Sequence, residues 1–185
     1  MILSILICTM PSRQAIFETL LGEVFSQIHK RNATSMVEVL WDNSTACTTG
    51  RKRNHLLTLS KGKYVVFIDD DDEIAENYLE LILNALQDNP DVDCIGMRGY
   101  VTFNGANRKD WSISIEHKYW HETPQEYLRT PNHISPVRRS IALLGKFPDI
   151  SYGEDMEYSQ RILPYLKTEA YIPEYLYHYK FITVK

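Results

Sequence analysis

The chain has 185 residues, of which 44% are hydrophobic and 24% are charged, and this length and composition predict one compact domain over residues 1–185 rather than two. The formal net charge at pH 7 is −4, and the basic residues are scattered apart from Arg51, Lys52 and Arg53. The charge pattern therefore argues against a nucleic-acid partner.

The cysteines and the apolar stretches of the sequence indicate where in the cell the protein is expected. Cys8, Cys47 and Cys94 lie far apart and form no CxxC pair, so we expect buried, reduced thiols. The opening stretch MILSILICTM has no basic leader, and no later stretch reaches the roughly 18 apolar residues of a membrane span. We therefore expect a cytoplasmic protein without a transmembrane segment.

The first half of the chain predicts three strands that alternate with helices. Strands are expected over residues 2–8, 36–41 and 64–68, whose apolar character is typical of strands covered on both faces. We expect Ser12 to cap the first helix and Gly62 to end the second. This order predicts an α/β fold in which the ligand crevice lies beyond the carboxyl ends of the strands.

The second half has a different pattern, with longer strands and a hairpin signal. The expected elements are strands over residues 94–103 and 111–116 joined by a turn at Asn104-Gly105, helices over 138–144 and 154–166, and a closing strand over 170–181 with Pro173 at its edge.

Acidic residues gather where the third predicted strand ends, in the run Asp69, Asp70, Asp71, Asp72 and Glu73. Two carboxylates 4 Å apart repel by about 4 kcal/mol at an effective dielectric constant near 20, so a positive charge is expected there. A hard divalent cation, Mg²⁺ or Mn²⁺, would supply it. Alternatively, Asp72 caps the next helix, Glu73 and Glu76 favour its positive end, and the other carboxylates are solvated. The acid run alone does not decide between these readings.

The order of short motifs before and after the acid run favours the metal-binding reading. They are, in order, ILICTMPSR (5–13), VLWDNST (39–45), RN (53–54), GKY (62–64), VVFIDDDD (65–72), VRR (137–139), GKF (145–147) and GED (153–155), followed by Arg161. This series resembles the family 2 glycosyltransferases of the GT-A fold. The resemblance extends over most of the chain and rests on the order of the motifs more than on any one of them.

The resemblance implies a GT-A fold, with a Rossmann-like mixed central sheet flanked by helices and a small acceptor-side sheet. Residues 1–97 would form the nucleotide-sugar-binding half and residues 98–185 the acceptor-binding half. The implied activity is that of a metal-dependent, inverting glycosyltransferase of hexosyltransferase type, with Mn²⁺ or Mg²⁺ as cofactor. Its donor would be a nucleotide-diphosphate sugar, expected to be a UDP-sugar, and its acceptor a hydroxyl of a glycan or related molecule.

The resemblance also implies roles for the acidic residues. Asp71 would bind the metal directly, Asp69 would lie near the ribose or the metal shell, and Asp70 would play a supporting part. Asp155 falls on the family's catalytic base, with Glu154 as the second candidate. A positioned carboxylate that deprotonates a hydroxyl contributes roughly 10²- to 10⁴-fold to the rate, and a base opposite the leaving group inverts the anomeric carbon.

For nucleotide binding, the resemblance points first to Thr9, Asp42 and Arg53. The register around Asp42 stays open, because alignment on Ser44 would place Trp41 at the contacting position and leave Asp42 to end the strand. The alternative for Arg53 is an ordinary charged residue on the exposed face of a helix. Arg13 and Lys52 are further candidates of the same kind.

Histidines and aromatic residues are the candidates on the acceptor side. His133 could face the acceptor or be a loop histidine, and His178 is expected to pack among strand tyrosines rather than bind the metal. Trp120 could form part of an aromatic platform for a sugar, with at least one tryptophan of the group in the core. The full group is Trp111, Tyr119, Trp120 and His121.

Two rival functions stay open. A sugar-nucleotide pyrophosphorylase shares the fold but carries a glycine-rich loop after the first strand, whereas residues 9–13 here read TMPSR. A non-catalytic metal- or glycan-binding domain on the same scaffold would keep the fold and lose the turnover.

Overall fold

The structure, a computed structural model, describes residues 1–183. Its strands are β1 (Leu3–Cys8), β2 (Val37–Asp42), β3 (Tyr64–Phe67), β4 (Glu73–Ile74), β5 (Cys94–Phe103), β6 (Ala106–Ile113), β7 (His121–Glu122), β8 (Glu126–Arg129), β9 (Val137–Arg138) and β10 (Glu169–Phe181). Its helices are α1 (Gln14–Lys30), α2 (Thr49–Leu59), α3 (Tyr78–Asp88), α4 (Arg139–Gly145) and α5 (Glu154–Ile162), with 3-10 turns η1 (Pro11–Arg13) and η2 (Leu163–Tyr165).

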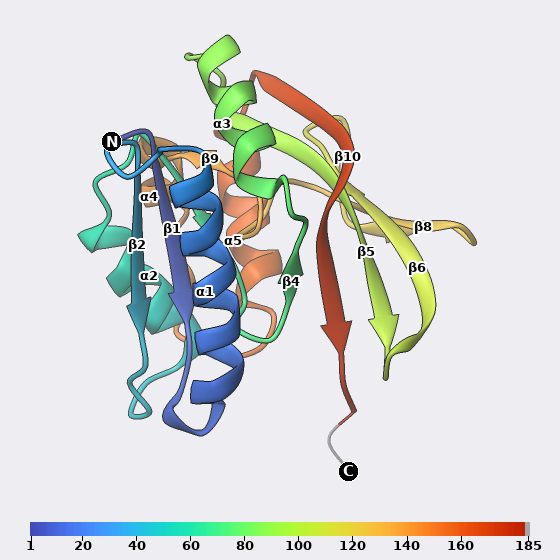
Figure 1. Cartoon of the computed structure of the whole chain (residues 1–185). Helices are drawn as coiled ribbons and strands as arrows, with labels where there is room; N and C mark the ends of the chain where they lie inside the picture. The colour runs from blue at the N-terminus through green and yellow to red at the C-terminus, as the bar shows by residue number, and fades with distance from the viewer. Residues whose placement is uncertain (184–185) are drawn as a thin grey trace.

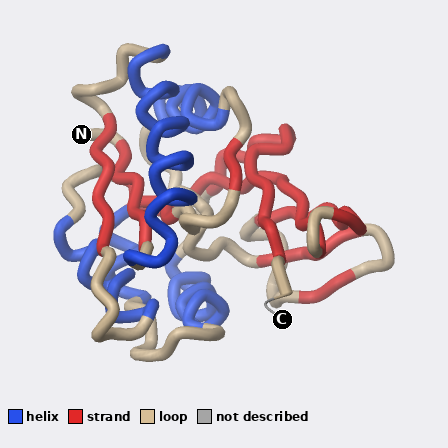
Figure 2. The backbone as a smooth tube through the Cα atoms, turned by 60° about the horizontal axis from the view of Figure 1, so that its bottom comes forward, coloured by secondary structure: helices blue, strands red, loops and turns tan. Residues whose placement is uncertain are grey.

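Hydrogen bonds join the strands into one mixed sheet with the order β2-β1-β3-β9-β5-β6-β8-β7, and β10 pairs with both β5 and β4. Strands β1, β2 and β3 are parallel, whereas β9 runs antiparallel to its neighbours β3 and β5. Helices α1 and α3 lie in front of the sheet in Figure 1 and α2, α4 and α5 lie behind it. The strands of the second half continue the sheet beyond the helical layers (Figure 2). The predicted mixed sheet flanked by helices is confirmed.

Strands β1 and β3 are covered on both faces, which explains why they do not alternate with polar residues. The prediction is wrong for β2, which lies at the edge of the sheet, is only half-buried and has Trp41 48% exposed. In β1, Leu3 and Ile5 belong to the hydrophobic cluster that packs under α1 and α3. Leu6 of β1, with Val65 and Phe67 of β3, belongs to a second cluster under α2, α4 and α5. Successive residues of a strand point to opposite faces, so one short apolar run serves both clusters.

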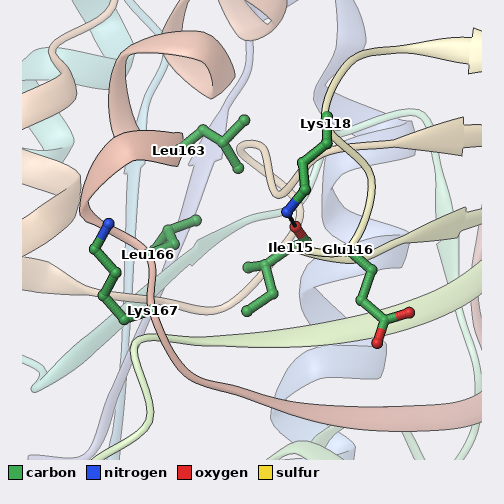
Figure 3. Close-up of a pocket in the computed structure, with 6 residues that line it drawn as sticks. All are labelled: Ile115, Glu116, Lys118, Leu163, Leu166 and Lys167. Carbon is green, nitrogen blue, oxygen red and sulfur yellow. Dashed lines mark hydrogen bonds between the residues drawn. The ribbon is translucent and has the colours of Figure 1, made fainter.

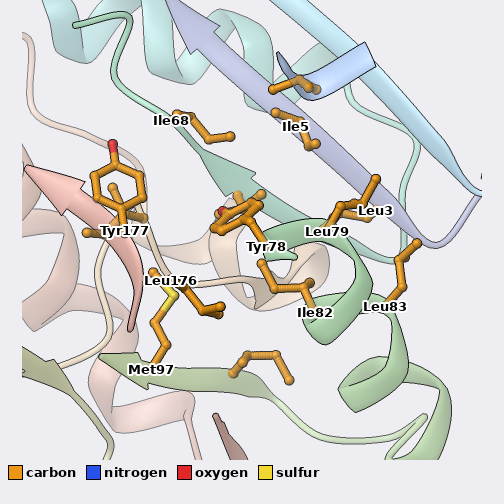
Figure 4. Packing of buried hydrophobic residues seen from close by; sticks show 14 of the residues in the cluster. Leu3, Ile5, Ile68, Tyr78, Leu79, Ile82, Leu83, Met97, Leu176 and Tyr177 are labelled. Carbon is orange, nitrogen blue, oxygen red and sulfur yellow. The ribbon is translucent and has the colours of Figure 1, made fainter. Parts of the chain in front are cut away.

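Helix α3 closes the first cluster with side chains one helical turn apart. Tyr78, Leu79, Ile82 and Leu83 are each at most 1% exposed. Figure 4 shows them pointing toward the strands, with Met97 of β5 and Leu176 of β10 on the far side. The cluster therefore joins strands from both halves of the chain.

Two predicted helix ends are wrong. Ser12 does not cap the first helix, because Pro11–Arg13 form a 3-10 turn and α1 begins only at Gln14. Gly62 does not end the second helix, which stops at Leu59 and begins after Thr48, whose hydroxyl accepts from Arg51 N. Gly62 is instead required where the chain passes close to β1: a Cβ atom there would lie 2.6 Å from the backbone nitrogen of Ser4.

The predicted hairpin is confirmed, although its second strand covers Ala106–Ile113 rather than residues 111–116. Asn104 (φ 53°) and Gly105 (φ 77°) both have positive φ and join β5 to β6, as a two-residue turn between twisted strands requires. The last helix is shorter than predicted, because Pro164 lies in the 3-10 turn that follows Ile162. The register of β10 on β5 shifts around Pro173. The short strands β4, β7, β8 and β9 are not among the predicted elements.

Within residues 1–183, no helix combines the length and the apolar character that crossing a bilayer demands. Cys8, Cys47 and Cys94 are free thiols, of which Cys94 is buried and the other two are half-buried. Burial raises the pKa of the Cys8 thiol to about 12.

Substituting Gly62 tests the close approach to β1. We expect Gly62→Ala to lower the free energy of unfolding by about 1–3 kcal/mol, because the new methyl group would meet backbone atoms of Ser4 and Tyr64 that cannot turn away. Gly22→Ala is the matched control, since nothing lies within 4 Å of a Cβ on that helical glycine. It should raise stability by about 0.5–1 kcal/mol. Urea unfolding measures both changes, and equal stability of the two variants would contradict the packing.

Candidate active site

The site forms where β1, β2 and β3 end, as the strand order predicts. The backbone nitrogen of Thr9 donates to the carbonyl of Asp42 at 2.9 Å, which brings the ends of β1 and β2 together. From α2, the buried ammonium of Lys52 donates to the carbonyl of Thr9 at 2.6 Å. Thr9, Asp42 and Lys52 are thus joined, although Lys52 serves the backbone and not an exposed surface.

Asp69, two residues after the end of β3, is held between the guanidinium of Arg53 and the imidazole of His133. Its Oδ1 lies 2.8 Å from Arg53 Nη2, and its Oδ2 lies 3.2 Å from His133 Nε2. Burial alone would raise the pKa of Asp69, but the charges of Arg53 and His133 outweigh it and hold that pKa well below its ordinary value. Asp69 is therefore a carboxylate at neutral pH.

The next two aspartates share a different cation. Arg13 Nη1 lies 2.7 Å from Asp70 Oδ1 and 3.0 Å from Asp71 Oδ2. The side chain of Asp70 is only 3% exposed, whereas that of Asp71 is 37% exposed. Burial and the adjacent carboxylates of Asp70 and Asp69 raise the pKa of Asp71 against the lowering effect of Arg13.

The end of the acid run turns toward β10. Asp72 accepts from the Tyr177 hydroxyl at 2.8 Å and from the backbone nitrogen of Lys180 at 2.9 Å. Asp72 is not a helix cap, because α3 begins later, at Tyr78. Burial, together with the charge of Asp69, raises the pKa of Asp72 well above its ordinary value.

Glu73 completes the run by pairing with His178 at 2.8 Å and with Lys180 Nζ at 3.2 Å. The positive charge expected beside the acid run is thus supplied within the protein, by Arg13, Arg53 and Lys180. Crowding of the carboxylates alone therefore gives no separate argument for a metal ion. His178 packs in β10 as predicted, and its ring stacks on Tyr100 at 4.4 Å.

The second pair of acids approaches from α5, which begins after Gly153 in a left-handed conformation (φ 81°). Glu154 Oε1 lies 3.5 Å from Arg53 Nη1, and Asp155 Oδ2 lies 3.9 Å from His133 Nδ1. The side chain of Glu154 is 6% exposed and that of Asp155 is 29% exposed. Of the two, Asp155 is the acid that a ligand can reach.

Several buried polar atoms of the site have no hydrogen-bond partner among the described residues. They include Thr9 Oγ1, Arg53 Nη1, Asp70 Oδ2 and His133 Nδ1. Buried polar atoms without a partner are rare in native proteins. Their concentration here supports a ligand site at the strand ends.

A hollow of about 460 Å³ adjoins the end of β2 and is lined by Trp41, Asp42, Asn43, Ser44, Cys47, Arg51 and His55. Asp42 Oδ2 lies 2.9 Å from His55 Nδ1, and Asp42 Oδ1 accepts from the Ser44 backbone nitrogen at 2.9 Å. Burial opposes ionisation, but these hydrogen bonds keep the pKa of Asp42 below its ordinary value. Trp41 and Asp42, the two alternatives left open by the register, both line this hollow.

In the second half of the chain, Trp120 Nε1 donates to Thr130 Oγ1 at 2.9 Å, and Thr130 in turn contacts Ser159 of α5. The Arg129 guanidinium lies 5.0 Å from the centre of the Trp120 ring. Trp111 is only 6% exposed and lies in the core, so it cannot form part of the predicted aromatic platform for a sugar. Trp120 is therefore connected to the helix that carries Asp155.

Sequence reasoning missed three residues of this region. His55 pairs with Asp42, and Tyr177 donates to Asp72 from a distant strand. Tyr179, 41% exposed on the same strand, lies near enough to the acid run that burial and the charges of Asp72 and Asp69 raise its pKa to about 12. No local pattern marks these residues, because β10 reaches the acid run, and His55 of α2 reaches Asp42, only through tertiary packing.

A second hollow, of about 410 Å³, lies at the far end of α5 (Figure 3). It is lined by Ile115, Glu116, Lys118, Leu163, Leu166 and Lys167. None of the candidate site residues lines it, so it is separate from the site at the strand ends.

The residues suit a divalent ion shared with a substrate rather than a metal cage. Among residues 1–183, no three His, Cys, Asp or Glu side chains are grouped to hold an ion. Mg²⁺ typically uses one or two carboxylates together with substrate phosphates and water. Asp71, partly exposed at the mouth of the site, fits that arrangement, whereas both oxygens of Asp69 already contact Arg53 and His133.

Comparison with solved structures identifies the fold. The crystal structure of residues 1–349 of S. aureus TarS in complex with UDP-GlcNAc matches with a TM-score of 0.70 and 15% identity, over 100% of this chain and 60% of that chain. The same protein in complex with UDP matches with a TM-score of 0.68 and 16% identity, over 97% and 60%. The chain thus spans 60% of the length of these structures. At this identity the likeness shows the fold, and it confirms the predicted GT-A architecture.

Comparison with curated proteins gives no match. The sequence model of glycosyl transferase family 2, however, matches residues 30–144, which is over half of the chain and includes α2, β3 and the acid run. The chain therefore belongs to glycosyl transferase family 2.

Proposed function

We propose that the chain is a metal-dependent, inverting glycosyltransferase that moves a sugar from a UDP-sugar onto a hydroxyl of a glycan or related acceptor. One observation carries the proposal: His133 lies between Asp69 at 3.2 Å and Asp155 at 3.9 Å. A carboxylate suited to the donor and a carboxylate suited to the acceptor thus meet at one side chain. Group transfer requires donor and acceptor to bind side by side, because their reacting atoms must come close together.

The donor half of the proposal rests on the end of β2. The hollow beside Trp41 and Asp42 measures about 460 Å³, and Asp42 offers an ionised carboxylate to a nucleobase N–H. TarS, which shares the fold, has been crystallised with UDP-GlcNAc and with UDP. These points favour a uridine nucleotide, with Thr9 Oγ1 as a free buried polar atom nearby.

The acceptor half rests on Asp155. A hydroxyl is a poor nucleophile at neutral pH, and a carboxylate in contact with it can remove the proton as the bond to the sugar forms. Asp155 is exposed enough to meet an acceptor, and Trp120, which contacts Ser159 of the same helix, and Tyr179 would border it. A single base on the face opposite the departing diphosphate gives inversion.

Asp71 is the residue that would hold Mn²⁺ or Mg²⁺, with Asp69 behind it. Bound there, the ion would neutralise charge on the departing nucleoside diphosphate. His133 and Arg53 would keep Asp69 ionised and in place.

Arg53 acts, in this proposal, through Asp69 rather than on the nucleotide. Its side chain is 4% exposed and lies between Asp69 and Glu154. It also contacts the rings of Phe67 and Phe147, with its guanidinium 5.6 and 5.5 Å from their centres. A cation enclosed in this way positions two carboxylates and has little surface left for a substrate.

Asp155→Asn tests the base. We expect UDP-sugar turnover with Mn²⁺ to fall by roughly 10²- to 10⁴-fold while the Kd for UDP stays unchanged. Glu157→Gln is the matched control on the same helix, since Glu157 pairs only with Arg161 among the described residues and is partly exposed; it should keep wild-type turnover. A wild-type protein that binds UDP but turns over no donor would favour the non-catalytic binding domain.

Asp42→Ala tests the nucleobase contact. Hydrogen bonds to charged groups contribute about 1.5–3 kcal/mol, so we expect the Kd for UDP to rise about tenfold or more. Asp88→Ala, an exposed aspartate at the end of α3, should leave the Kd unchanged. Isothermal titration calorimetry measures both values. A wild-type Kd in Asp42→Ala would leave Asp42 as a residue that ends β2 and pairs with His55.

Arg53→Met tests the buried counterion. Removing one member of a buried ion pair costs about 3–5 kcal/mol, because the carboxylates of Asp69 and Glu154 lose their partner. The exposed pair of Arg51 and Asp149, 3.9 Å apart, provides the control, and Arg51→Met should change stability by less than about 0.5 kcal/mol. Urea unfolding measures both. Addition of Glu154→Gln should restore part of the loss in Arg53→Met, and a loss under about 1 kcal/mol would contradict the role.

A further inference from the structure

The guanidinium of Arg13 occupies the mouth of the acid run. Arg13 ends the 3-10 turn after β1, and its Nη1 lies 2.7 Å from Asp70 and 3.0 Å from Asp71. Its side chain is 41% exposed, unlike that of Arg53, which is 4% exposed. Arg13 is therefore the accessible one of the two arginines that hold the acid run.

The two carboxylates that Arg13 contacts differ in what they can do. Asp70 is enclosed, its Oδ2 has no partner among the described residues, and its Oδ1 pairs with Arg13. Asp71 is open to solvent and can exchange one cation for another. Loss of the buried contact would be costly, whereas exchange at the exposed contact costs little.

We propose that Arg13 is a resident counterion of Asp71 that a divalent cation displaces, and that Asp70 then keeps the guanidinium in place to contact the donor diphosphate. The proposal rests on the metal role of Asp71 in the proposed function. The new element is a competition, because the guanidinium of Arg13 and the metal ion are both positive and would bind the same carboxylate, that of Asp71. It also makes Asp70 a positioning residue that acts through Arg13.

The physical basis is charge repulsion in the free protein and attraction once the diphosphate arrives. A guanidinium and a doubly charged ion some 6 Å apart repel by about 1.4 kcal/mol in water, which corresponds to a factor of about ten in affinity. A diphosphate bound between the guanidinium and the ion would attract both. A guanidinium also matches phosphate oxygens with paired N–H donors. Removing Arg13 should thus strengthen metal binding and weaken diphosphate binding.

The first measurement is titration of the full chain with Mn²⁺ alone, following the free ion by electron paramagnetic resonance. We expect Arg13→Gln to bind Mn²⁺ about tenfold more tightly than wild type. Arg13→Lys, which keeps the charge, should stay near wild type. Lys30→Gln removes the same charge from the far end of α1, roughly 25 Å away along the helix, and should change nothing.

The second measurement is calorimetric titration with UDP in the presence of EDTA. Arg13→Gln should bind UDP about tenfold more weakly, with partial rescue in Arg13→Lys. Opposite shifts for the two ligands cannot come from a damaged fold, which would weaken both.

Asp71→Asn separates this inference from the proposed function. If Asp71→Asn loses Mn²⁺ binding but Arg13→Gln binds Mn²⁺ no more tightly than wild type, the competition is overturned and the metal assignment stands. If Asp71→Asn binds Mn²⁺ as wild type does, the metal assignment fails and the competition fails with it. Weaker binding of both ligands in Arg13→Gln would likewise overturn the competition.

Discussion

The carboxylate of Asp69, held between the guanidinium of Arg53 and the imidazole of His133, is the contact on which the site depends. Its three members come from the end of β3, from α2 and from the loop before β9. The same two partners extend to Glu154 and Asp155 at the start of α5. Through Arg53 and His133, Asp69 therefore connects the start of α5 to the strand ends. A shift of β3, of α2 or of the loop before β9 would move the carboxylates at the strand ends and on α5 together.

The carboxylates of the acid run are divided among several partners within the protein. Asp69 is balanced from within the protein, Asp70 by Arg13, and Asp72 by a hydroxyl and a backbone N–H from β10. Of the four aspartates, Asp71 is the most exposed, and its partner Arg13 is exposed as well. Asp71 is therefore the carboxylate of the run that a ligand from solvent can reach most easily.

The sequence predicts the strands and helices of the first half well because apolar periodicity is local, and the order of motifs brings Asp69, Asp155 and their neighbours to one site. The predictions that fail depend on distant contacts. Gly62 faces Ser4 of another strand, and Asp72 meets Tyr177 and Lys180 near the other end of the chain. Arg53 is an exposed helix charge by composition alone, and only the packing of α2 against the strand ends encloses it. Tertiary partners of this kind leave no mark in a local pattern.

The two adjacent acids of α5 have different surroundings because successive residues of a helix point about 100° apart. Glu154 turns inward to Arg53, where burial raises its pKa against the opposing charge of that arginine. Asp155 turns toward the opening, beside His133 and 29% exposed. A general base needs contact with the hydroxyl that it deprotonates, and a carboxylate fully committed to a buried arginine cannot provide it. Gly153, in a left-handed conformation just before them, sets where the helix begins and therefore which acid faces inward and which faces the opening.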